Sequence, residues 1–252
     1  MGQGLTSLMG NTAQALISAC KGGDKETVRT LINQGTSPDI RDDDGKTLLM
    51  IASSYGHLGI VNVLVTKNAQ LDDADKNGVT PLMLGSANGH VGVVELLVQH
   101  GADINKANKD GVTPLLIGSH NGHVGLVEIL VQHGAAVNKA DKDGVTPLLI
   151  GSQNGHVGVV ELLVQHGADT NKAEKDGVAP LLIGSQNGHV GVVELLVQHG
   201  ADINKANKDG SQNGHVNVVE LLVQHGADVN KAMDYGVTPL MLGSENGHVG
   251  VV

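Results

Sequence analysis

Histidines are the residues of this chain that first suggest chemistry, because thirteen of them occur in 252 residues. Most belong to two rows that repeat at a fixed interval: His90, His123, His156 and His189 form one, and His100, His133, His166 and His199 form the other. A zinc ion needs several ligand atoms, with its histidine nitrogens at about 2.0–2.1 Å, whereas stacked helices lie about 8–10 Å apart. One row therefore cannot share an ion. We interpret the histidines as structural turn residues and expect no metal or other cofactor.

The aspartate-rich stretch at residues 73–78 resembles the first half of a calcium-binding loop, with Asp73, Asp75 and Asn77 at alternate positions before Gly78. A complete loop requires a bidentate acid at its twelfth position, and that position is Leu84. The coordination would be incomplete, so we interpret the stretch as an exposed turn.

The acidic run at residues 42–45, DDDG, is interpreted as a solvated turn whose charge could select a basic partner. The thirty-six glycines form no phosphate-binding loop, and no nucleophile lies in a pattern with a base. We therefore predict that the protein is not an enzyme.

The first residues, MGQGLT, match the pattern for N-myristoylation, with Gly2 as the acceptor. A single myristoyl chain gives only marginal membrane binding, and the stretch lacks a polybasic patch. Two interpretations remain open: a lipidated Gly2 with weak membrane association, or an unmodified and flexible start.

The composition favours a cytoplasmic, monomeric protein. There is one cysteine, Cys20, which suits a reducing compartment. No apolar run approaches the length of a membrane-spanning helix. The net charge of −10 argues against nucleic acid as a partner. Because Trp and Phe are absent, the core must consist of Leu, Ile and Val.

The dominant feature of the sequence is a unit of 33 residues. Residues 79–111 recur in near-identical form as 112–144, 145–177 and 178–210. A fixed period of this size indicates stacked supersecondary units, each of which contacts only its neighbours. Such an array presents an extended surface rather than a closed pocket.

Local signals predict two short helices in each unit. Thr80 suits an N-cap and Pro81 a first helical position. The first helix should run to about Asn88, where Gly89 supplies a left-handed stop. The second should span about residues 91–100, and the polar stretch after it should form a turn-rich finger. Glycines inside these helices, such as Gly85 and Gly92, indicate either close helix packing or a compliant array.

These motifs resemble those of ankyrin repeats over nearly the whole chain. The family's opening motif T-P-L-H corresponds to TPLM at residues 80–83, and its N-G-H element and G-A-D-x-N exit recur in register. Met or Leu replaces the family's histidine at the fourth position, so the usual Thr–His hydrogen bond is not expected. The resemblance implies an all-α solenoid of stacked helix-turn-helix units with projecting β-hairpin-like fingers.

The register divides the chain into three parts. Residues 1–11 are expected to be a flexible tail, and residues 12–210 to hold two divergent and four near-identical repeats. Residues 211–252 would hold one repeat that lacks its first helix, since the heptapeptide VTPLLIG is missing after Gly210, and one repeat truncated within its second helix. The missing segment is either a hinge or an error of assembly.

The resemblance implies a non-catalytic scaffold or adaptor that binds protein partners through finger tips and the concave face of the first helices. The alternative is the regulatory part of a larger enzyme or channel. The expected contact residues are Lys76, Asn77, Lys109, Asp110, His120, Asn121, Lys142, Asp143, Gln153, Asn154, Lys175, Asp176, Gln186, Asn187 and Tyr235.

The resemblance also implies a modification. Asn105, Asn204 and Asn230 lie in the leucine-spaced Asp-Val-Asn-like pattern that an asparaginyl hydroxylase recognises in ankyrin proteins, whereas Asn138 and Asn171 depart from it. The structural alternative is that these asparagines hold the fingers by side-chain-to-backbone hydrogen bonds.

Overall fold

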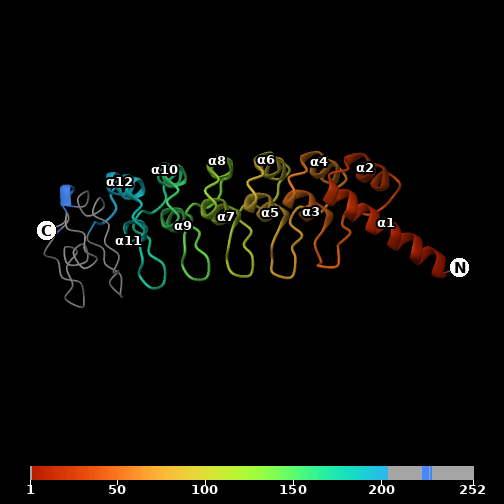
Figure 1. The fold of residues 1–252 in the computed structure, drawn as a ribbon, viewed down its shortest axis with the longest axis horizontal. Helices are drawn as coiled ribbons and strands as arrows, with labels where there is room; N and C mark the ends of the chain where they lie inside the picture. Colours follow the sequence, from red (N-terminus) through yellow and green to blue (C-terminus); the bar gives the residue numbers. More distant parts are fainter. Residues whose placement is uncertain (1, 204–222, 227, 229–252) are drawn as a thin grey trace. The chain divides into compact units, whose positions relative to one another are not determined.

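The computed structural model describes residues 2–203, 223–226 and 228 (Figure 1). These residues form α-helices joined by turns, with an isolated β-bridge between Arg41 and Thr47. The chain divides into two compact units. The first comprises the residues up to Gly118 together with Glu128–Ala135, and the second comprises Ser119–Val127 together with the residues from Ala136 onward. The predicted all-α architecture is confirmed.

The helices come in pairs, and a finger-like loop separates each pair from the next (Figure 1). The first helices are α1 (Gly2–Gly22), α3 (Leu48–Ser54), α5 (Pro81–Ala87), α7 (Pro114–His120), α9 (Pro147–Gln153) and α11 (Pro180–Gln186). The second helices are α2 (Lys25–Asn33), α4 (Leu58–Thr66), α6 (Val91–Gln99), α8 (Val124–Gln132), α10 (Val157–Gln165) and α12 (Val190–Gln198). In the first unit α3 packs on α5 and α4 on α6; in the second, α9 packs on α11 and α10 on α12.

Capping residues explain where the helices begin and end. Thr80 accepts a hydrogen bond from the backbone N–H of Met83 at 3.3 Å, and Pro81 occupies the first turn of α5. Gly89 follows this helix with a φ of 70°, a conformation that favours glycine. The predicted bounds of the helices in this repeat are confirmed to within about one residue.

The core of each unit is aliphatic, as predicted from the lack of Phe and Trp. Leu82 and Met83 of α5 are buried, as are Val94 and Leu97 of α6. Met83 occupies the position of the family's histidine, so this position adds apolar surface to the core instead of a polar bond. In the preceding repeat the equivalent Met50 sulfur accepts a long hydrogen bond of 3.5 Å from the backbone N–H of Thr47.

The beginning of the chain differs from the expected tail, because α1 runs from Gly2 and includes residues 2–11. No proline lies between Gly2 and Gly22, so nothing in the covalent structure stops the helix from extending. The predictions for residues 211–252, including the effect of the missing heptapeptide, concern residues that lie almost entirely outside the described part of the chain.

A histidine from one repeat ties down the end of the first helix of the repeat before it. In the second unit, His189 Nε2 lies 3.0 Å from the carbonyl oxygen of Gln153, the last residue of α9. The same contact joins His156 to His120 at 3.0 Å, and in the first unit it joins His90 to Ser54 at 3.1 Å. These bonds satisfy carbonyls at helix ends, which confirms a structural role for these turn histidines.

The imidazole packs directly over a glycine of the earlier repeat. Gly155 has a φ of 74°, and a Cβ placed there would lie 2.6 Å from Nδ1 of His189. Gly167 has a similar φ of 83°, but a Cβ there would meet nothing within 4 Å. The two glycines therefore separate the effect of backbone conformation from that of the histidine contact.

We predict that Gly155→Ala destabilises the second unit by at least about 2 kcal/mol more than Gly167→Ala. Both alanines carry the left-handed penalty of roughly 1–2 kcal/mol, but only the first also displaces the His189 ring. Urea unfolding followed by circular dichroism measures the difference. Equal losses for the two variants would show that the histidine yields without penalty.

Cys20 lies fully buried in α1, and this burial raises the pKa of its thiol to about 12. The folded state therefore keeps a proton that the unfolded chain loses above about pH 9. It follows that the contribution of Cys20 to stability is present below that pH and declines as the pH rises further.

We predict that Cys20 reacts with an aromatic disulfide reagent at pH 8 at least about tenfold more slowly in the native protein than in urea, because the reactive thiolate is suppressed and shielded. The released thiolate is followed by absorbance. Equal rates in the two states would place Cys20 in contact with solvent.

Candidate functional site

The finger that follows each second helix is shaped by one side chain. In residues 103–111, Asn108 Oδ1 accepts hydrogen bonds from the backbone N–H groups of Asp110 and Val112, both at 2.9 Å. The backbone N–H of Asn108 donates to the carbonyl of Val112 at 3.0 Å, as in a hairpin. Asp75 and Asp141 make the same pair of side-chain bonds in their own fingers. The calcium-like aspartate at position 75 is thus a turn residue, as interpreted from the sequence.

Neighbouring tips are joined through the backbone. The N–H of Lys109 donates to the carbonyl of Asn77, and the N–H of Lys175 donates to that of Asp143, each at 3.0 Å. The Lys175 ammonium also lies 3.6 Å from the carboxylate of Asp143, but both side chains are largely exposed, so this pair adds little stability. The backbone bonds set the spacing of the tips, and the charged side chains remain available.

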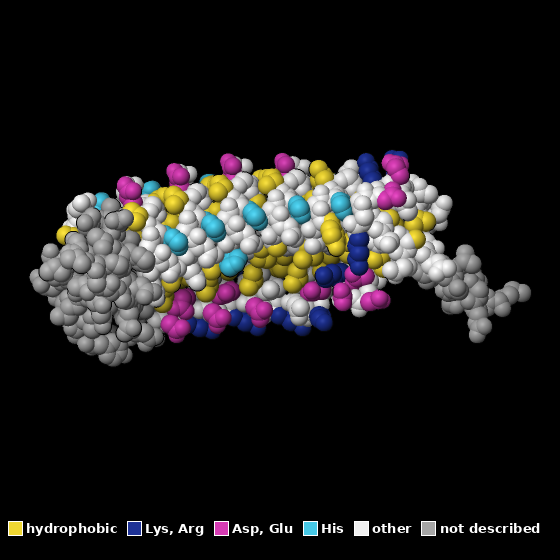
Figure 2. Space-filling model, viewed as in Figure 1, with side chains coloured by type: hydrophobic (Ala, Val, Ile, Leu, Met, Phe, Trp, Pro, Cys, Tyr) yellow, Lys and Arg dark blue, Asp and Glu magenta, His cyan; other side chains and the backbone are white. Residues whose placement is uncertain are grey.

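The predicted tip residues are all exposed. They are Lys76, Asn77, Lys109, Asp110, Lys142, Asp143, Lys175 and Asp176. Figure 2 shows acidic and basic side chains along the finger edge, with apolar side chains between part of that edge and the helices. The tips therefore present both signs of charge.

The predicted contacts on the first helices are less uniform. His120 and Gln153 are exposed, whereas Asn154 is half-buried and its amide donates to the carbonyl of His120 at 2.9 Å. Asn187 is exposed, but its amide donates to the carbonyl of Gln153 at 2.8 Å. Asn121 is exposed and Gln186 half-buried. Part of this amide row therefore holds adjacent repeats together. Tyr235 lies outside the described residues.

Sequence reasoning missed the apolar part of this face. Leu84, Ile117, Ile150 and Ile183 are half-buried residues of the first helices. Each lies three positions before the last residue of its helix and four before the asparagine that follows, which places these residues on one helical face. The signal was available, because the predicted contacts His120 and Asn121 fix that face of α7.

The finger asparagines form a ladder of hydrogen bonds between repeats. Asn138 Nδ2 donates to the carbonyl of Gly167 at 3.0 Å, and its Oδ1 accepts from the backbone N–H of Asp169 at 2.8 Å. Asn171 makes the same two bonds in the next repeat. Asn105 Nδ2 donates to the carbonyl of Gly134 at 3.2 Å. The structural alternative for these residues is therefore confirmed. Hydroxylation of Asn105 stays a prediction, and Asn204 and Asn230 lie outside the described residues.

Asp72 interrupts this ladder in the second repeat. Its Oδ1 accepts a hydrogen bond from the backbone N–H of Asp103 at 3.0 Å, as the asparagines do. A carboxylate carries no N–H, so it cannot donate the second bond to a glycine carbonyl. Lys106 Nζ donates to the backbone carbonyl of Asp72 at 2.8 Å and holds this finger from the other side.

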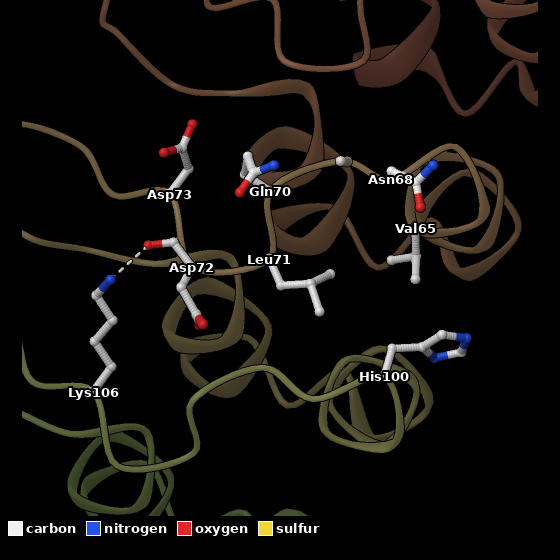
Figure 3. A pocket seen from close by; sticks show the side chains of 9 residues that line it. Val65, Asn68, Gln70, Leu71, Asp72, Asp73, His100 and Lys106 are labelled. Atoms are coloured by element: carbon white, nitrogen blue, oxygen red, sulfur yellow. Dashed lines mark hydrogen bonds between the residues drawn. The ribbon is translucent and has the colours of Figure 1, made fainter.

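A hollow of about 660 Å³ lies beside Asp72 (Figure 3). Its lining residues are Val65, Asn68, Ala69, Gln70, Leu71, Asp72, Asp73, His100 and Lys106. Asp73 pairs with Arg41 at 2.7 Å, and Lys106 reaches across to Asp72. The lining of the hollow thus includes both acidic and basic groups.

We predict that Asp72→Asn stabilises the first unit by about 0.5–1.5 kcal/mol, because the new amide donates the missing hydrogen bond. The matched reverse change, Asn138→Asp, should destabilise the second unit by about 1–3 kcal/mol, since it removes a donor and sets a carboxylate against a carbonyl. Urea unfolding checks both variants. A loss of stability in Asp72→Asn would show that the carboxylate has partners that an amide cannot replace.

In the part of the chain that the structure describes, no group of three or more His, Cys, Asp or Glu is arranged to hold a metal ion. The helices found there also include none that is both long and apolar enough to cross a membrane.

Comparison with known families agrees with the geometry. A family model described as ankyrin repeats in three copies matches residues 16–108, 105–174 and 135–207. A second, described as ankyrin repeats in many copies, matches residues 211–252. A comparison with curated proteins gives no match. The helix pairs, the capped Thr-Pro turns and these matches together show that the chain belongs to the ankyrin repeat family, whose members generally serve as protein–protein interaction modules.

Proposed function

We propose that this protein is a non-catalytic scaffold or adaptor that binds protein partners through its finger tips and the exposed face of its first helices. The observation that carries the proposal is the repeated, exposed tip pair. Lys109 and Lys175 each begin such a pair, and their backbones are bonded to the preceding tip at 3.0 Å. Rigid spacing and exposed charge together suit recognition of an extended protein surface.

The half-buried apolar residues of the first helices support the same proposal. The half-buried Ile117, Ile150 and Ile183 supply apolar contact area, while the charged tips would form a polar rim around it. A surface with this division is typical of protein interfaces rather than of small-molecule pockets. We further propose that the protein works as a monomer in the cytoplasm, where the buried Cys20 thiol stays reduced.

We predict that the triple variant Lys109→Glu, Lys142→Glu and Lys175→Glu captures its protein partners about tenfold more weakly, since each exposed charge contributes up to about 1 kcal/mol. Mass spectrometry of proteins retained from cell extract measures the capture, and circular dichroism checks the fold. Lys67→Glu, at an exposed position just after α4, is the control. Unchanged capture by the triple variant would move the interface away from the central fingers.

A further inference from the structure

Near-identical repeats leave the position of a partner undefined. The repeats between residues 79 and 203 carry almost the same residues at their exposed positions, so a partner bound to one set of tips could shift to the next set with little change in energy. Only a residue that occurs in one repeat can fix the register. The turn after each first helix holds such a difference: Tyr55 stands where the following repeats have Asn88 and Asn121.

Tyr55 has the properties of an interface anchor. Its side chain is 55% exposed, in a protein that has two tyrosines and neither Phe nor Trp. Tyrosine is enriched among the residues that dominate binding energy. The adjacent Leu58 is 44% exposed and extends the apolar surface along α4.

The ring of Tyr55 rests on a fixed support. It stacks on the His57 ring with centroids 5.8 Å apart and an interplanar angle of 8°. His57 Nε2 is in turn 3.2 Å from the carbonyl oxygen of Lys21, and its ring packs over Gly23. Because these contacts fix the imidazole, and the imidazole supports the tyrosine ring, little side-chain entropy is lost when a partner contacts the opposite face of that ring.

The first two fingers carry an excess of negative charge. Lys21 links the pair to the first finger, since its ammonium lies 3.7 Å from the Asp42 carboxylate. That finger, residues 37–45, holds four aspartates and one arginine, and the next, residues 70–78, holds three aspartates and one lysine. By contrast, the fingers at 103–111 and 136–144 each hold two acids and two lysines. Asp43 and Asp44 at the first tip are exposed.

We propose that Tyr55, with the first two fingers, is the docking site that sets the register of a basic protein segment containing arginine. A guanidinium group would stack on the free face of Tyr55, while neighbouring cations would lie against Asp43 and Asp44. Arginine fits better than lysine because its planar group stacks on aromatic faces. This inference rests on the proposed protein-binding function and names the chemistry of the partner.

The test uses the full chain with Tyr235→Phe, so that Tyr55 is the remaining tyrosine and its fluorescence reports directly on the site. The probe is a capped peptide, Gly-Arg-Gly-Arg-Gly-Arg-Gly, and the matched peptides carry Lys or Glu in place of Arg. We expect the arginine peptide to change the fluorescence and to bind about threefold more tightly than the lysine peptide, and the glutamate peptide to show no binding. A glutamate peptide that binds as well as the arginine peptide would overturn the proposal.

Variants separate the anchor from the fold, with affinity measured by calorimetry. Tyr55→Asn introduces the residue that the other repeats carry, so the fold should persist while affinity for the arginine peptide falls about tenfold. Tyr55→Phe should retain most of the affinity, and Asp43→Asn with Asp44→Asn should lower both the affinity and its salt dependence.

Adding Asn88→Tyr to Tyr55→Asn should restore part of the binding, because Gly89 and His90 follow position 88 as Gly56 and His57 follow Tyr55.

Affinity of Tyr55→Asn within twofold of the parent, or no recovery with Asn88→Tyr, would contradict the proposed register site. The proposed scaffold function is tested separately, because it depends on capture of whole proteins by the central finger tips. If capture is lost in the triple lysine variant while Tyr55→Asn has no effect, the scaffold stands and the docking site does not.

Discussion

The structure depends on hydrogen bonds that pass from each repeat to its neighbour. A pair of helices of seven and nine residues, such as α9 and α10, is too short to be stable alone in water. Stacking buries its apolar faces, but the polar groups at the helix ends and finger bases must also find partners. His189 supplies one for the end of α9, and Asn138 supplies two at the finger base. Apolar burial drives the stacking, and these bonds fix its geometry.

The divergent repeats show where this constraint can be relaxed. Asp72 gives up one bond of the asparagine ladder, and a hollow lies beside it. Tyr55 replaces an asparagine whose equivalents at positions 154 and 187 bond to the repeat before them. Both departures weaken the uniform scheme and add a surface that the other repeats lack. Residues that break a local pattern in this way are natural places to look for function.

Much of the fold could be predicted because its signals are local. The Thr80-Pro81 pair, Gly89 and the polar finger act within a few residues, and their positions gave the helix bounds correctly. Features that depend on a neighbouring repeat were harder. The contact of His189 with Gly155 joins residues 34 positions apart, and the exposure of Tyr55 follows from what lies beside it rather than from its own sequence context. The helix over residues 2–11 was missed because three glycines there suggested a flexible chain.

The direction of these bonds has a consequence for the history of the chain. His90, His156 and His189 reach back to the preceding repeat. Asn105, Asn138 and Asn171 reach forward to the following one. Each such repeat therefore carries, on its two sides, the groups that bond to a neighbour of the same sequence. An in-frame duplication of the gene segment inserts a copy that fits at once, with no compensating change needed in either neighbour. The near-identical copies between residues 79 and 210 are what such a self-matching joint permits: the length of the array can change by recombination while its geometry is inherited intact.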